Sequence, residues 1–177
     1  GVIPVPNNVS PGNTVPFKFN RGYIHSYNFT LQREFGKLVA EAAYVGNRGV
    51  RLLTNENINA APVGGGEAGR LLFPVANKNW GNINCLCPDG PSYYNSLQSK
   101  LTWRLGGSSA IGVVYTFSRA INWTDNEEVS TTFGGQGGSL FWPYPGYRDR
   151  NKALATFDRT HNLSFYGVYE LPFGKRQ

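Results

Sequence analysis

The sequence contains no methionine, two histidines and two cysteines, and it is poor in charge. Charged residues make up 16% of the 177 residues, whereas aromatic residues make up 14%. So little charge together with so many aromatic residues argues against intrinsic disorder. Glycine, asparagine, threonine, tyrosine and phenylalanine are abundant, which excludes a helical bundle and favours an all-β chain rich in loops.

Long apolar runs are also missing. No stretch approaches the roughly 18 residues that a membrane helix needs, so any membrane role must come from strands or from the surface. The net charge is +6, but the lysines and arginines form no basic run, and we expect no nucleic-acid partner. Because the chain opens at Gly1 without a signal-peptide pattern, we expect a processed product or an excerpt.

Alternating apolar and polar residues predict about five antiparallel amphipathic strands. We expect them at residues 23–34, 38–53, 92–105, 110–121 and 159–171. Residues 1–22 are predicted to form a Pro-rich extended arm, and residues 23–177 a single antiparallel β domain. Within that domain we expect long loops at about 54–91 and 122–158, with short turns between the other strands.

Short turns that alternate with long loops indicate the class of β protein. Outer-membrane β-barrels join their strands by short periplasmic turns and long extracellular loops. A soluble β-sandwich also has alternating strands, but its turns usually recur every 8–12 residues. The pattern therefore favours barrel-type strands over a sandwich.

Six segments carry a family resemblance. In chain order they are YNFTLQRE at 27–34, YVGNRG at 44–49, YNSLQ at 94–98, YTFSRAI at 115–121, FDRTH at 157–161 and GVYELPFG at 167–174. Their order and spacing resemble those of TonB-dependent outer-membrane receptors, most closely the Oar-like group common in acidobacteria. The resemblance implies a barrel segment from the carboxy-terminal half of such a receptor, in a Gram-negative bacterium.

The chain departs from that family in size. A complete receptor barrel has about 22 strands, and the smallest barrels have eight. Five strands leave open edges and an uncovered apolar face, so we expect neighbouring subunits or a larger barrel to complete the sheet. The plug and the energy-coupling box of the family have no counterpart here, so energy-coupled transport does not carry over.

Two functions follow from an incomplete barrel. The first is structural and non-enzymatic: copies of the chain would pair strands and exchange arms to form an extracellular fibre, with the protein itself as the partner. The alternative is an excerpt of a receptor barrel that binds and transports a ligand, and only then would outer-membrane lipid be a partner. The location would be extracellular, at the cell surface or in the outer membrane.

Cys85 and Cys87 are the candidate disulfide residues. Their closeness in sequence makes an internal bridge difficult, but an oxidising exterior favours a disulfide within or between subunits. Inert thiols and a metal site are the weaker alternatives.

Aromatic residues of the long loops are the remaining candidates. Trp80, Trp123, Trp142, Tyr144 and Tyr147 are expected to pack loop against loop or subunit against subunit, with ligand stacking as the alternative. The acidic run 125–128 has no EF-hand spacing, which favours a solvated loop over a calcium site. No G-x-S-x-G elbow accompanies the histidines, and we expect no catalytic residue, no metal and no cofactor.

Overall fold

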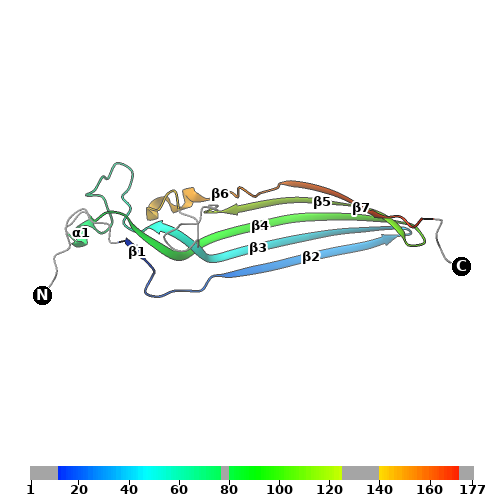
Figure 1. Ribbon diagram of the computed structural model, residues 1–177, viewed down its shortest axis with the longest axis horizontal. Helices are drawn as coiled ribbons and strands as arrows, with labels where there is room; N and C mark the ends of the chain where they lie inside the picture. The colour runs from blue at the N-terminus through cyan, green and yellow to red at the C-terminus, as the bar shows by residue number, and fades with distance from the viewer. Residues whose placement is uncertain (1–11, 77–79, 125–139, 172–177) are drawn as a thin grey trace. The chain divides into compact units, whose positions relative to one another are not determined.

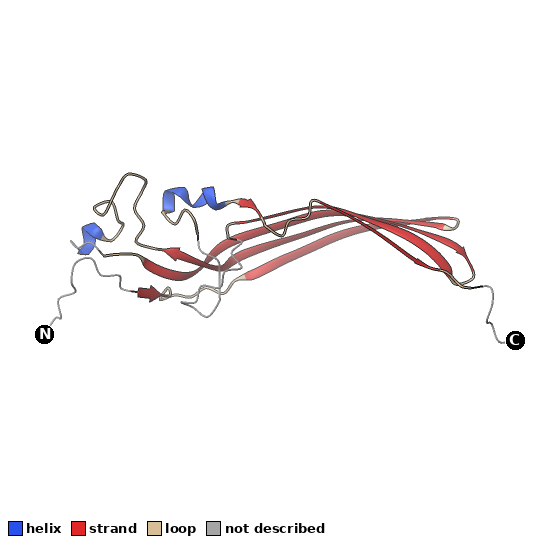
Figure 2. Cartoon of the chain, turned by 45° about the horizontal axis from the view of Figure 1, so that its top comes forward, coloured by secondary structure: helices blue, strands red, loops and turns tan. Residues whose placement is uncertain are grey.

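The computed structural model describes residues 12–76, 80–124 and 140–171. Strands dominate these residues, and the helices are short (Figure 2). In chain order the elements are β1 (Gly12–Thr14), β2 (Tyr23–Phe35), β3 (Leu38–Asn57), α1 (Phe73–Ala76), β4 (Ile83–Gly106), β5 (Ser109–Asn122), the 3-10 helix η2 (Pro145–Asn151), β6 (Ala153–Leu154) and β7 (His161–Val168). The all-β prediction is confirmed.

The strands form one sheet in the order β2-β3-β4-β5-β6, with β1 added to β4 and β7 added to β5. Figure 1 shows β2, β3, β4 and β5 side by side. β5 and β7 are antiparallel, with a register that runs from Ala110↔Val168 to Phe117↔His161. The three residues of β1 lie parallel to β4. Because the order does not return to β2, the sheet formed by the described strands is open and has unpaired edges.

Several strand ends differ from the expected ones. β3 continues to Asn57 and β4 already begins at Ile83, so residues 58–82 connect them, fewer than the expected 54–91. The pairing extends because the Ile58 amide donates to the Ile83 carbonyl at 2.9 Å. β7 is shorter than expected, and a strand lies within the expected arm at Gly12–Thr14.

Two compact units divide the described chain. Of the described residues, unit 1 comprises 12–24, 49–76, 80–92, 121–124 and 140–156, and unit 2 comprises 25–48, 93–120 and 157–171. β3, β4 and β5 contribute residues to both units. The single β domain expected over 23–177 stays a prediction.

Tight turns close the short connections in unit 2. Gly36 and Gly106 have φ angles of 60° and 116°, in the left-handed region that favours glycine. The turn after β4 is also tied to the residues after β7, since the Ser108 amide donates to Glu170 Oε2 at 3.0 Å. In return the Glu170 amide donates to Ser109 Oγ at 2.9 Å. The two short turns expected between strands are therefore present.

Burial differs between the two units. In unit 1 the buried residues include polar ones, with Thr54 and Asn59 each 1% exposed. In unit 2 the buried described residues are all small: Ala43, Gly46, Ser96, Ser109, Ser118 and Ala120. Unit 2 therefore has no core of large apolar side chains among its described residues, and its large apolar side chains face outward.

Candidate lipid-facing surface and strand-end cluster

One face of unit 2 carries the large apolar side chains. They alternate along each strand, so they lie on the same side of the sheet. Leu31 is 62% exposed and Phe165 77% exposed, although both are strongly apolar. The set is Tyr27, Phe29, Leu31, Phe35, Leu97, Leu101, Trp103, Leu105, Ile111, Tyr115, Phe117, Leu163 and Phe165. We call this set the apolar face; a contiguous apolar surface of this kind marks contact with lipid or another protein.

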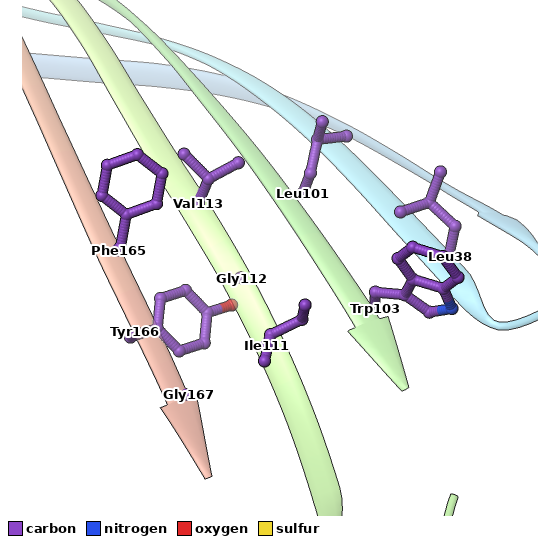
Figure 3. Close-up of a pocket in the computed structure, with 9 residues that line it drawn as sticks. All are labelled: Leu38, Leu101, Trp103, Ile111, Gly112, Val113, Phe165, Tyr166 and Gly167. Carbon is purple, nitrogen blue, oxygen red and sulfur yellow. The ribbon is translucent and has the colours of Figure 1, made fainter. Parts of the chain in front are cut away.

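A groove of about 700 Å³ lies on the apolar face (Figure 3). Leu38, Leu101, Trp103, Ile111, Val113 and Phe165 line it, together with Gly112, Tyr166 and Gly167. Figure 3 shows these side chains contributed by neighbouring strands rather than by one loop. Since the groove offers almost only hydrocarbon and aromatic groups, it suits acyl chains or apolar side chains.

The opposite face of unit 2 is polar. Arg104 donates to Glu34 Oε1 at 2.7 Å, with both side chains more than half exposed. Thr102 Oγ1 lies 2.5 Å from the Tyr166 hydroxyl, and the Lys100 ammonium lies 5.7 Å from the centre of the Tyr166 ring. The two faces therefore differ sharply in polarity, as in a barrel wall between lipid and a polar interior.

Tyrosine rings cover two glycines within the strands. Side chains built at Gly46 and Gly112 would collide with the rings of Tyr27 and Tyr166, respectively. Figure 3 shows the Tyr166 ring beside Gly112. An aromatic ring over a strand glycine compensates for the missing side chain, so both tyrosines are expected to stabilise the sheet.

Arginines stack on aromatic rings of β2 and β4. The Arg33 guanidinium lies 4.9 Å from the centre of the Phe35 ring, near the short turn that ends β2. The Arg48 guanidinium lies 5.6 Å from the Tyr93 ring centre. Aromatic and long cationic side chains are favoured at membrane interfaces because they combine an apolar body with a polar end.

In unit 1 a cluster of charged groups joins the ends of two strands to the segment that contains η2. Arg148 donates through Nη2 to both carboxylate oxygens of Glu56, at 2.7 and 2.6 Å. Through Nη1 it donates to Asp89 Oδ2 at 2.8 Å, while Thr54 Oγ1 donates to Asp89 Oδ1 at 2.7 Å. We call Glu56, Asp89 and Arg148 the strand-end cluster.

Burial changes the acidity of Glu56, which lies in the part of β3 that belongs to unit 1. Desolvation, and to a smaller extent the negative charge of Asp89, raise the pKa of the Glu56 carboxyl, which comes to about 7 with all neighbours included. The Arg148 guanidinium acts in the opposite direction but does not cancel these effects. The Arg148 Nε is buried without a hydrogen-bond partner among the described residues, so this ion pair is incompletely satisfied.

The structure joins Cys85 and Cys87 by a disulfide, with Cα atoms 5.3 Å apart. This separation lies within the usual range for a disulfide, despite the short sequence spacing. Both residues belong to β4, where Cys85 pairs with Thr14 of β1 and is 2% exposed. The bridge therefore lies within one strand of unit 1.

Three of the five expected aromatic residues come together. Trp142 and Tyr147 meet edge to face at 6.2 Å, and Tyr144 lies 5.3 Å from Tyr147. The Arg150 guanidinium lies over both Trp142 and Tyr147, at 5.5 and 4.8 Å. These aromatic faces are therefore engaged with their own loop.

The other two aromatic candidates lie apart from this group. The Trp80 carbonyl accepts a hydrogen bond from Asn59 Nδ2 at 2.9 Å, and its indole Nε1 is buried without a partner among the described residues. Trp123 follows β5 and is half-buried. The calcium candidates at 125–128 lie outside the described residues.

Sequence reasoning missed the strand-end cluster. Arg148 belongs to one of the densest groups of charge in the sequence, but Glu56 and Asp89 lie far from it along the chain. Only the pairing of β3 with β4 brings the two acids together. Among the described residues, no three His, Cys, Asp or Glu side chains are arranged to hold a metal ion.

Comparison with known proteins identifies the family. The model of the outer membrane beta barrel domain matches residues 3–177. The chain belongs to this family. No curated protein and no solved structure matched the chain. No helix of the described residues is long and apolar enough to cross a bilayer.

Family membership agrees with the two-faced sheet. The open sheet is a segment of an outer-membrane β-barrel, and the family places it in the outer membrane of Gram-negative bacteria. The match does not specify the type of barrel, and the TonB-dependent receptor type is indicated by the sequence motifs alone.

Proposed function

We propose that this chain forms part of the wall of a TonB-dependent receptor barrel, with the apolar face against lipid. The long connections between its strands would then face the exterior and contact the ligand. The observation that carries this proposal is that large exposed apolar side chains alternate with polar ones along the same strands. The receptor-like motifs along the sequence add the receptor type.

The length of the apolar face fits a membrane. The stretch of β2 from Tyr27 to Phe35 has nine residues, and a tilted transmembrane strand needs about 9–11. Aromatic residues at both ends of this stretch would lie at the two interfaces, where aromatic girdles form. β2 therefore has the length and the composition of a membrane-crossing strand.

The strands with long connections are longer than a membrane crossing needs. A tilted transmembrane strand needs about 9–11 residues, whereas β3 has 20 residues and β4 has 24. In this arrangement the short turn at Gly36 lies on the periplasmic side. The parts of β3 and β4 that carry Glu56 and Asp89 belong to unit 1, and in this proposal they support the ligand-contacting loops.

The open sheet needs further strands to close. β2 and β7 each have one neighbour among the described strands. An open edge in a bilayer leaves backbone groups unsatisfied, which costs several kcal/mol per group. The remaining strands of a receptor barrel would satisfy both edges. In this proposal the segment is structural and ligand-binding, without catalysis.

A second candidate is the extracellular fibre. The open sheet edges and the exposed apolar face also favour a fibre, because copies of the chain would cover both. The difference is the material against the apolar face: lipid in a barrel, and protein in a fibre.

Purification with and without detergent, followed by electron microscopy, separates the two. A barrel segment requires detergent and gives discrete particles. Regular filaments in detergent-free preparations would overturn the receptor proposal in favour of the fibre.

A further inference from the structure

Residues 140–151 form a loop that is cross-linked by its own side chains, which we call the strap. Asn151 Oδ1 accepts a hydrogen bond from the Trp142 amide at 2.8 Å. Its Nδ2 group donates to the carbonyls of Trp142 and Arg148, at 3.0 and 2.9 Å. Arg150 covers the rings of Trp142 and Tyr147. These contacts hold the strap in one shape and favour its movement as a unit.

The strap is attached to the strands at two described places. The Leu140 amide donates to the Asn55 carbonyl at 2.9 Å. Arg148 reaches Glu56 of β3 and Asp89 of β4. After the strap, β6 pairs with β5 and provides a separate tether. Because Arg148 supplies the ion pairs to both acids, the strand-end cluster is the main side-chain attachment.

The attachment is unbalanced in charge. Two carboxylates face one guanidinium, so the ionised cluster has a formal charge of −1. The Glu56 side chain is 2% exposed, whereas that of Arg148 is 29% exposed. The charged groups that bear on Glu56 are Asp89 from β4 and Arg148 from η2. One added proton makes the cluster neutral while Arg148 stays paired with Asp89.

We propose that the strap closes onto the ends of β3 and β4 with the uptake of one proton at the strand-end cluster. Mild acid therefore tightens the strap and mild alkali loosens it. The strap would act as a pH-responsive cover of the strand ends beneath it. This proposal concerns unit 1 alone and does not depend on what covers the apolar face of unit 2.

The acidity of Glu56 supports this direction. Its pKa is raised from 4.5 to about 7 in the closed form, mainly by desolvation. When the strap opens, water reaches the carboxyl and its pKa returns toward the ordinary value. The closed form then binds protons more tightly than the open form, and linkage requires that it gain population as the pH falls from 8 to 6. Acid would release the strap only if the pKa of the carboxyl were lowered in the closed form, whereas the pKa of Glu56 is raised.

Hydrogen exchange read by mass spectrometry on the intact protein, between pH 6 and 8.5, tests the proposal. After correction for the intrinsic pH dependence of exchange, protection of residues 140–151 should rise about tenfold from pH 8.5 to pH 6. The paired amides of β5 and β7 serve as an internal reference and should stay constant. Protection of the strap that is flat, or that falls in acid, overturns the proposal.

Two variants with the same change of charge refine the test. Glu56→Gln mimics the protonated carboxyl and should make strap protection independent of pH. Glu67→Gln removes an exposed carboxylate of unit 1 and should keep the wild-type tenfold response. A response that persists in Glu56→Gln, or that disappears in Glu67→Gln, contradicts the assignment to the strand-end cluster. If Glu56→Gln does not fold, the wild-type titration against the β5–β7 reference still decides.

Discussion

Replacement of Leu31 by arginine probes the lipid-facing assignment at its centre. Leu31 lies midway between Tyr27 and Phe35 on the apolar face of β2 and is 62% exposed. Full burial of a leucine side chain is worth about 1.5–3 kcal/mol, so lipid contact with this exposed part contributes about 1–2 kcal/mol. Arginine on the lipid face at the bilayer midplane of a β-barrel costs about 2–4 kcal/mol.

The neighbouring residue supplies the control. Thr30 lies on the opposite face of β2, which is polar in the proposed barrel. Thr30→Arg should change the free energy of unfolding by about 0.5 kcal/mol or less, as expected for an exposed polar site. Denaturant titration of the intact protein in phosphatidylcholine vesicles measures both values. Equal costs for the two variants, or a greater cost for Thr30→Arg, would refute the assignment of faces.

Three further predictions concern single residues. When the pH is lowered from 8 to 6, the free energy of unfolding of unit 1 should rise by about 1 kcal/mol, because Glu56 binds a proton more tightly in the folded than in the unfolded chain. Denaturant titration at both pH values measures this change, and a lower stability at pH 6 would contradict it. Gly106→Ala should cost about 1 kcal/mol or more, because alanine is strained at a φ of 116°; the same substitution at Gly146, which lies outside the positive-φ glycines, is the comparison. Tyr27→Ala should cost at least 1 kcal/mol in the same assay, because it uncovers Gly46; an unchanged stability would show that the ring contributes nothing there.

The sequence predicted the strands well because each strand of unit 2 has one apolar and one polar face. Apolar and polar residues alternate along β2 and β4 because lipid or protein covers only one face of the sheet. The short turns at Gly36 and Gly106 were predictable for a similar reason, because glycine is needed for a positive φ.

Unit 1 was less predictable. β3 continues past residue 53 and β4 starts before residue 92, although these stretches show no clean alternation of apolar and polar residues. Buried polar residues such as Thr54 and Glu56 read as loop positions in the sequence, but ion pairs and hydrogen bonds hold them within the strands. The strand-end cluster depends on contacts across many residues of sequence, which no local pattern reports.

A nitroxide scan along β2, from residue 27 to residue 35, tests the central claim most directly. In reconstituted bilayers, spin labels at the apolar-face positions Tyr27, Phe29, Leu31 and Phe35 should be accessible to oxygen and shielded from a water-soluble nickel complex. Labels at the even positions between them should show the reverse, with a period of two. Apolar-face positions shielded from both reagents would show a dry protein contact and contradict a lipid-facing barrel wall.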